Sequence, residues 1–334
     1  MAISYVTTIV PLDLSQRPWD ILLKAVRLAR AAERANVTLI FGHNDHNKTS
    51  DKLFKRIIQK FKTTVIVSGL FYTEGVNSSL LRNKAFSEVK TDYLLLLDVD
   101  IWPDFSLIEK YVQKVKNNEK PFYMVPCLYL TKRGSKDLVS SKILPSELKK
   151  RFFSFSRKEF LHLASPSSVI IMKKTDYETL NGFNTDFVGH GYEDFDFMMR
   201  LAHHHNYLIP AADLLLDKTA RAPLFAVGFR RYLGEQCLDL LLEKDIVFHL
   251  HHAKPKESKY HAARPSNYQL FTKLHNGKVG SELVEDPTLI GSFSKKCSEK
   301  KLNIHDYAIF FDNKPGHIDR FDSFRRRLRF LLNE

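Results

Sequence analysis

The stretch YLLLLDVDIWP, residues 93–103, indicates the fold of this chain more clearly than any other part of it. Its apolar run is rich in leucine and follows a helix-like segment, which is typical of a buried parallel strand. The run ends on two aspartates, Asp98 and Asp100. In a doubly wound α/β fold, ligands bind just beyond the carboxyl ends of such strands. Two carboxylates in a dry site need a cation, and a divalent ion bridging to a phosphate commonly meets that need.

Two other roles are open to this pair. One aspartate could cap a helix beginning at Phe105, although Asp104 is already in place to do so. A D-x-D triplet at a strand end also occurs in haloacid-dehalogenase-type phosphatases, where the first aspartate is a nucleophile. That class has the triplet near the N-terminus with a small Gly/Thr turn after it, and neither feature is present here. The ligand-binding role is therefore favoured.

The composition favours anionic partners. The 334 residues include 51 Lys and Arg against 38 Asp and Glu, a formal net charge of +13. Nucleotide phosphates, nucleic acid or an anionic membrane surface would suit this charge, but no RNA-binding signature is visible, so nucleic acid is not expected. Three scattered cysteines without a CxxC pair predict reduced thiols. With neither a signal-peptide pattern nor a membrane-spanning run, we expect a cytoplasmic protein.

The first half of the chain alternates between strand-like and helix-like segments. This order implies a parallel sheet with helices on both faces. A further helix (105–116) and strand (122–129) are expected to extend the sheet, whereas residues 130–160 are charged and turn-rich and predict a surface excursion. The other strands are expected at 5–10, 38–41 and 64–67 and before Asp98, and the other helices at 19–35, 52–61 and 78–89.

A second cluster is GHGYEDFDF, residues 189–197, where a glycine loop leads into a helix whose first turn contains Glu193, Asp194 and Asp196. Acidic residues at this position are favoured by the helix dipole, which is a sufficient structural reason for some of them. Three carboxylates in four residues exceed what capping requires. One of them could act as a general base.

A third cluster is His249, His251 and His252 at the end of a predicted strand. Alternation puts His249 and His251 on one face of the strand, and imidazole is a suitable extra ligand for Mn²⁺. The triplet at residues 203–205 ends a helix instead, and we interpret it as structural.

Together these segments resemble GT-A glycosyltransferases. The resemblance rests on the order of a strand with Pro11, Arg82-Asn83 before LLLLDVD, NGFNTDFVGHGYEDFDFMMRL, and VFHLHH, over residues 4–255. More narrowly, the chain is similar to bacterial family 2 enzymes that build capsules or other surface polysaccharides. GYEDFDF also resembles the acidic acceptor motif of β-1,4-galactosyltransferases and chondroitin polymerase. The resemblance implies an α/β GT-A domain at 1–255, with a mostly parallel central sheet flanked by helices, and a helical C-terminal extension at 256–334.

The resemblance also implies roles for single residues. Those of the nucleotide site would be Pro11, Arg17, Asp45, Arg82, Asn83 and Asp98, with Asp98 on ribose or uracil. Asp100 would ligate Mn²⁺ or Mg²⁺, and His249 or His251 would complete the metal shell. Asp194 would be the catalytic base of an inverting transfer and Glu193 would hold the acceptor. The usual paired aspartates after the second strand are replaced here by His43-Asn44-Asp45, which leaves the base contact open.

The implied substrates are a UDP-sugar donor and a glycan or lipid-linked saccharide acceptor. The C-terminal stretch HIDRFDSFRRRLRFLLNE, residues 317–334, predicts a basic amphipathic helix. It suits either the inner face of the cytoplasmic membrane or the protein's own core. The basic segment 221–234 could be a flap over the donor phosphates, with Arg230 and Arg231 as contacts, or a solvated loop. The alternative function is a non-catalytic basic scaffold that binds nucleotide, nucleic acid or membrane.

Overall fold

The structure is a computed structural model that describes residues 5–218, 220–253, 262–281 and 286–312. The chain forms two compact units, and each is assembled from three separate stretches of sequence. The first unit comprises residues 1–123, 168–208 and 253–277, and the second comprises 124–167, 209–252 and 278–334. The two units are described separately below.

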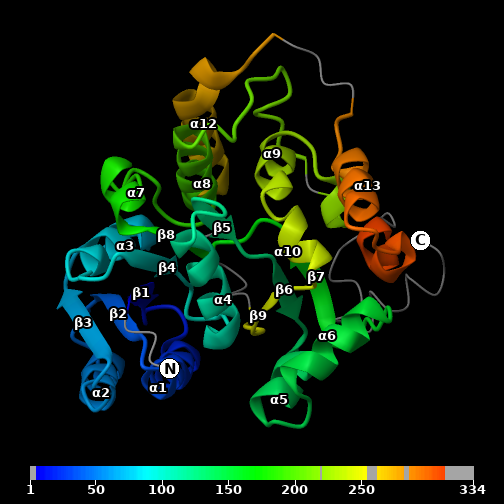
Figure 1. Ribbon diagram of the computed structural model, residues 1–334. Helices are drawn as coiled ribbons and strands as arrows, with labels where there is room; N and C mark the ends of the chain where they lie inside the picture. The colour runs from blue at the N-terminus through cyan, green and yellow to red at the C-terminus, as the bar shows by residue number, and fades with distance from the viewer. Residues whose placement is uncertain (1–4, 219, 254–261, 282–285, 313–334) are drawn as a thin grey trace. The chain divides into compact units, whose positions relative to one another are not determined.

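A six-stranded sheet forms the first unit, with strand order β3-β2-β1-β4-β8-β5 (Figure 1). Its strands are β1 (Val6–Asp13), β2 (Thr38–Asn44), β3 (Thr64–Gly69), β4 (Tyr93–Leu96), β5 (Phe122–Met124) and β8 (Ile170–Lys173). Its helices are α1 (Pro18–Ala35), α2 (Thr49–Ile58), α3 (Ser78–Phe86), α4 (Phe105–Lys116), α7 (Lys174–Thr179), α8 (Glu193–His204) and α12 (Arg264–His275).

The strand pairing confirms the predicted α/β class. β1 pairs in parallel with both β2 and β4, and β2 pairs in parallel with β3. β8 runs antiparallel to β4, so the sheet is mixed rather than wholly parallel. Leu94, Leu95 and Leu96 of β4 have no exposed surface, as expected for a strand covered on both faces. The carboxyl end of this buried strand leads directly to Asp98 and Asp100.

Pro11 lies inside β1 and not after it, which corrects the expectation that the strand ends before it. The register pairs Pro11 with Gly42 of β2, while the pairing of β1 with β4 ends at Ile9. The missing N–H of proline therefore disrupts no pairing with β4, and the strand continues to Asp13.

Helices pack on this sheet through apolar stripes and one close approach. α1 begins with Pro18 in its first turn and ends at Asn36 in the left-handed conformation, and it packs against α2 and α4. α3 packs against β1 and β2. A Cβ atom on Gly42 would lie 1.9 Å from the carbonyl oxygen of Leu81, so only glycine lets α3 approach β2 this closely. This contact sets the position of α3, which contains Arg82 and Asn83.

Two expectations after β4 are wrong. The single strand predicted at 122–129 is divided into β5 and β6 (Cys127–Leu130), which belong to different sheets. Pro126 stands between them and cannot donate a hydrogen bond within a strand. The predicted surface excursion at 130–160 contains α5 (Lys132–Val139) and α6 (Pro145–Phe153). These helices are short and rich in charge, and α5 buries one large apolar side chain and α6 two, too few for a helical period to stand out in the sequence.

The second unit contains a three-stranded sheet, β7-β6-β9, with β9 parallel and β7 antiparallel to β6. Its remaining elements are β7 (Phe160–Ala164), β9 (Val247–His249), α9 (Phe229–Glu235), α10 (Leu238–Leu242), α13 (Ile290–Glu299) and the 3₁₀ helices η1 (Pro223–Phe225) and η3 (Ile304–Phe311). A further 3₁₀ turn, η2 (Asn276–Lys278), spans the boundary at residue 277.

Two expectations concern residues outside those that the structure describes. The predicted domain boundary at 255/256 falls within residues 254–261, and the predicted amphipathic helix falls within 313–334. Both stay predictions. Among the described helices, none combines the length and the apolar character needed to cross a bilayer.

Candidate functional site

Asp98 lies just past the carboxyl end of β4, where a ligand site was predicted. Its Oδ1 accepts a hydrogen bond from Nη2 of Arg82 at 2.7 Å, and its Oδ2 accepts one from Oγ of Ser168 at 2.6 Å. The side chain of Asp98 keeps 32% of its surface exposed. The carboxylate is therefore held from one side and open to a ligand on the other.

Arg82 connects the two acidic motifs. Its side chain is only 2% exposed, and its Nη1 lies 3.2 Å from Oδ1 of Asp194, while its Nη2 binds Asp98. The guanidinium carbon also lies 4.7 Å from the centre of the Phe183 ring, within the range of a cation–π contact. One buried cation thus holds carboxylates that lie almost a hundred residues apart in the sequence.

The loop before α8 is conformationally constrained. Gly191 has φ of 100°, and Tyr192, which precedes the helix, has φ of 74°, a region that bulky residues rarely adopt. A Cβ atom on Gly191 would lie 2.8 Å from Nη1 of Arg264, whose guanidinium lies 4.8 Å from the Tyr192 ring centre. These contacts fix the direction in which Glu193 and Asp194 leave the loop.

Both carboxyl groups at the start of α8 are harder to ionise than usual. Burial raises the pKa of Asp194 to about 6; the charge of Arg82 opposes this rise and that of Asp98 adds to it. Burial and the neighbouring Asp194 raise the pKa of Glu193 to about 8. Oε2 of Glu193 is buried and has no hydrogen-bond partner among the described residues. A base that ionises near neutral pH beside a protonated acid is suited to binding and deprotonating a hydroxyl group.

Asp196, the third acidic residue of this turn, has a structural role. It is 1% exposed, accepts a hydrogen bond from Nε of Arg200 at 2.9 Å and lies 2.9 Å from Nε2 of His275. His275 ends α12, so this pair holds α12 alongside α8 (Figure 1). Of the three carboxylates that could act as a general base, Glu193 and Asp194 therefore remain as candidates.

Asp100 faces α1 and not Arg82. It is 7% exposed, and its carboxylate accepts from Nη2 of Arg17 at 2.9 Å and from Nζ of Lys24 at 2.6 Å. Asp20 contacts the same two cations, at 2.5 and 3.0 Å. The two aspartates of the triplet thus have different surroundings, and the separate roles expected of them stay predictions. The sequence analysis did not predict a role for Lys24, because in the sequence it is one of several charged residues of α1 and nothing near it points to Asp100.

A polar platform lies at the ends of β1 and β2. Oδ2 of Asp13 accepts from the Tyr72 hydroxyl at 2.7 Å and from Asn44 at 3.4 Å. Asn44 is fully buried, and its Oδ1 accepts from the backbone of Phe71 and Tyr72. Asp45 pairs instead with Lys55 at 2.5 Å. Asp13 was missed because the strand was expected to end earlier; as a carboxylate at a strand end, it could have been found.

Asn83 uses its polar atoms within the protein. Its Oδ1 accepts from the Tyr177 hydroxyl at 2.6 Å and from the backbone of Phe183 at 2.9 Å, and its Nδ2 donates to the Phe183 carbonyl. These contacts hold the turn that places Phe183 beside Arg82. The predicted nucleotide contact of Asn83 stays a prediction, and the observed contacts favour a positioning role.

The histidine cluster lies in the second unit. β9 ends at His249, so the alternation predicted for His249 and His251 does not extend past that residue, which corrects the expectation. The His249 ring stacks on Tyr129 with centroids 4.1 Å apart and lies 5.5 Å from the ring of His252. His162, on β7, also stacks on Tyr129, and the centroids of these two rings lie 4.3 Å apart. The metal role of His249 and His251 stays a prediction.

The segment 221–234 is neither a solvated loop nor a flap with free arginines. It forms η1 and most of α9, and Phe229 and Leu233 have no exposed surface. Arg230 pairs with Asp217 at 2.6 Å and Arg231 lies 3.8 Å from Asp213. The segment is part of the core of the second unit.

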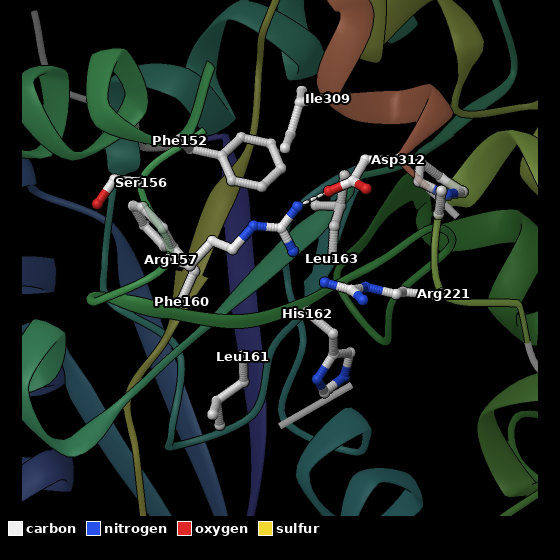
Figure 2. Close-up of a pocket in the computed structure, with 12 residues that line it drawn as sticks. Phe152, Ser156, Arg157, Phe160, Leu161, His162, Leu163, Arg221, Ile309 and Asp312 are labelled. Atoms are coloured by element: carbon white, nitrogen blue, oxygen red, sulfur yellow. Dashed lines mark ion pairs between the residues drawn. The ribbon is translucent and has the colours of Figure 1, made fainter. Parts of the chain in front are cut away.

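A basic pocket lies in the second unit as well (Figure 2). Arg157, Arg221 and His162 line it together with apolar side chains that include Phe152. Arg157 forms an ion pair with Asp312, which Figure 2 shows as a dashed line. The lining thus combines apolar side chains with cationic ones, one of which, Arg157, is paired with Asp312.

Known proteins provide an independent comparison. Residues 47–276 match the model of a family described as glycosyltransferase like family 2. A search among curated proteins found no match.

Similar solved structures are distant from this chain. They include Drosophila β1,4-galactosyltransferase 7 with xylobiose (14% identity, TM-score 0.32, covering 59% of this chain and 60% of that one). Staphylococcus aureus TarS 1–349 with UDP-GlcNAc is 10% identical (TM-score 0.42, 94% and 79%). Glucosyl-3-phosphoglycerate synthase from Mycobacterium tuberculosis with Mn²⁺, UDP and glucosyl-3-phosphoglycerate is also 10% identical (TM-score 0.37, 84% and 82%).

The match thus spans about 60% of the length of the galactosyltransferase chain. The family model covers well over half of the present chain, from the loop between β2 and α2 to the end of α12. The matched range includes Arg82, Asp98, Asp100 and the Glu193–Asp194 pair. The chain belongs to the glycosyltransferase-like family 2.

Proposed function

We propose that the first unit transfers a sugar from a UDP-sugar to a hydroxyl group of a glycan or lipid-linked acceptor, with inversion at the anomeric carbon. The observation that carries the proposal is the contact of one buried guanidinium, that of Arg82, with both Asp98 and Asp194. It brings a strand-end carboxylate suited to the donor together with a carboxylate suited to deprotonating an acceptor.

The donor half of the site is assigned to the ends of β1, β2 and β4. Asp98 keeps an exposed edge that can accept hydrogen bonds from ribose or uracil hydroxyl and N–H groups. Asp13, Asn44 and Tyr72 form a fixed polar platform that extends the same edge of the sheet. Arg17 and Lys24 supply positive charge for the diphosphate.

A divalent cation is assigned to Asp100. Asp100 is a buried carboxylate, the ligand type that a hard cation prefers, and its two oxygens are paired with Arg17 and Lys24, so a bound cation would have to displace at least one of these side chains. Mn²⁺ or Mg²⁺, when bound, would neutralise charge on the departing diphosphate. His249 or His251 is proposed as a further ligand on grounds of sequence alone.

Asp194 is assigned as the general base. With a pKa of about 6 it is largely ionised at neutral pH, yet basic enough to take the proton of the attacking hydroxyl. Glu193, with a pKa of about 8, is protonated at that pH and can donate a hydrogen bond to an acceptor oxygen. Attack of the hydroxyl in line with the departing UDP inverts the anomeric centre. The proton ends on Asp194.

A role in bacterial capsule or other surface polysaccharide synthesis, at the inner face of the cytoplasmic membrane, is part of the proposal. The net charge of +13 supports an anionic partner. The pocket of the second unit, where Arg221 lies with the Asp312-paired Arg157, would by itself suit a phosphate group.

Release of UDP from a panel of UDP-sugars, with Mn²⁺ or with EDTA, tests the function. We expect turnover of one or a few donors with Mn²⁺ and little with EDTA. If calorimetry detects UDP binding but no UDP-sugar is turned over with any glycan or lipid-linked acceptor, the protein is better described as a non-catalytic scaffold. Equal turnover in EDTA would contradict the metal dependence.

A further inference from the structure

Three metal-ligating side chains meet where α7 begins and α8 ends, outside the site described above. Asp176 lies in the first turn of α7, His204 ends α8, and His205 follows it. Nε2 of His205 lies 3.1 Å from Oδ1 of Asp176, and Nε2 of His204 lies 3.9 Å from the same oxygen. One ligand atom from each residue falls within 4.8 Å of the other two.

The Asp176 carboxylate is incompletely satisfied by the protein. Asp176 is 6% exposed, and its Oδ2 is buried without a hydrogen-bond partner among the described residues. A buried, ionised carboxylate is costly unless it is paired, so an unmatched oxygen beside two imidazoles indicates a missing partner. The side chains of His204 and His205 are 36% and 21% exposed, which leaves a path from solvent.

The chemistry of the three groups matches borderline divalent metals. Two imidazole nitrogens and one carboxylate oxygen form a three-ligand set used for Zn²⁺, with water in the fourth position. Ligands about 2.0–2.2 Å from a Zn²⁺ ion lie closer together than 4.8 Å. Rotation of the half-exposed His204 side chain would bring its ring nitrogen to the shorter separation from the other two ligands that a bound ion requires.

We propose that Asp176, His204 and His205 form a binding site for Zn²⁺ or a chemically similar divalent cation. The bound ion would join the end of α8 to the start of α7. Because α8 begins with Glu193 and Asp194, the ion would stabilise the helix on which the proposed base lies. The site does not depend on the proposed transferase activity. The histidine triplet was interpreted as structural from the sequence, because nothing in that segment points to Asp176.

Zn²⁺ calorimetry on the full chain, with Co²⁺ absorption spectroscopy in parallel, tests the site. An Asp100→Asn background without UDP removes the proposed donor metal from the measurement. We expect one Zn²⁺ per chain, a higher melting temperature with Zn²⁺, and visible absorption bands of Co²⁺ bound by nitrogen and oxygen ligands. No Zn²⁺ binding by this protein would overturn the proposal, whatever its transferase activity.

The triplet provides its own control. His203 is exposed and adjacent, but it is not part of the cluster. His204→Gln and His205→Gln are expected to weaken Zn²⁺ binding about tenfold or more, and His203→Gln to leave it unchanged. Asp176→Asn should have the same effect as the cluster variants, and His204→Gln, at the more exposed position, keeps the test valid if Asp176→Asn fails to fold. Equal loss with His203→Gln would show adventitious binding to surface histidines and contradict the site.

Discussion

Nη1 of Arg82 lies 3.2 Å from Oδ1 of Asp194, and the arginine has almost no exposed surface. A charge this deeply buried is tolerated because two carboxylates neutralise it. The same contact opposes the rise in the pKa of Asp194 that burial causes. Arg82 is therefore expected to position the proposed base and to keep it ionised, in addition to any contact with the nucleotide.

Arg82→Lys tests this role. A lysine keeps the charge but has no planar fork to contact both Asp98 and Asp194. We expect Asp194 to protonate more readily, so that the acid limb of the pH–rate profile moves above its wild-type position near pH 6. Arg30→Lys, on the exposed face of α1, is the matched control. An unchanged acid limb in Arg82→Lys would show that Arg82 does not control the base.

The pH dependence of transfer follows from the raised pKa values at the start of α8. The base acts when ionised, so kcat/KM should rise as pH increases through about 6, the pKa of Asp194. Loss of the Glu193 proton should lower the rate above about pH 8, and Glu193→Gln should remove that alkaline limb. Since the two groups interact, the profile reports apparent values of the pair. A flat profile of kcat/KM for the acceptor from pH 5 to 9, measured at saturating donor, would contradict both assignments.

Asp100→Ala separates the proposed metal role of Asp100 from its ion pairs. The variant leaves Arg17 and Lys24 in place, so some UDP binding through the diphosphate should remain and should weaken with salt. We expect UDP affinity to lose its response to Mn²⁺, as measured by calorimetry. The exposed Asp92→Ala is the control. A Mn²⁺ response equal to wild type would rule out Asp100 as a ligand.

Gly42→Ala tests the close packing that positions Arg82. The new Cβ would lie 1.9 Å from the Leu81 carbonyl oxygen, so α3 must move away from β2. We expect the free energy of unfolding to fall by about 1–3 kcal/mol, as for other overpacked sites. Gly277→Ala, where a Cβ meets nothing within 4 Å, should leave stability nearly unchanged. Equal stability of the two variants in urea unfolding would contradict the packing argument.

Much of the first unit could be predicted from the sequence because local signals agree there. Apolar runs at strand period and helical stripes such as that of α1 place β1 to β4 and their helices within a few residues. Asp104 caps α4 as expected, accepting from the backbone of Leu107 at 3.1 Å. Predictions failed where Pro126 divides a strand and where short charged helices contain too few apolar residues to show a period.

The residues of the candidate site likewise fall into those that the sequence predicts and those that it does not. Asp98, Asp100 and Glu193–Asp194 stand in short motifs at element ends, which are visible in sequence. Lys24, Ser168 and His275 act through partners far along the chain, and no local pattern predicts such pairs. The pairing of Arg82 with both acidic motifs likewise depends on how α3 packs on the sheet.

The central claim, that Asp194 is the base beside a separate donor site, is tested most directly by Asp194→Asn. The asparagine keeps the size of the side chain and an oxygen that can accept from Arg82, but it cannot take a proton from a hydroxyl. Asp186→Asn, in the exposed loop before α8, is the control. The measurement is sugar transfer from a UDP-sugar by each variant, with UDP affinity determined on the same samples. We predict that Asp194→Asn binds UDP as the wild type does and loses transfer by about a hundredfold or more; transfer at the rate of Asp186→Asn would contradict the account.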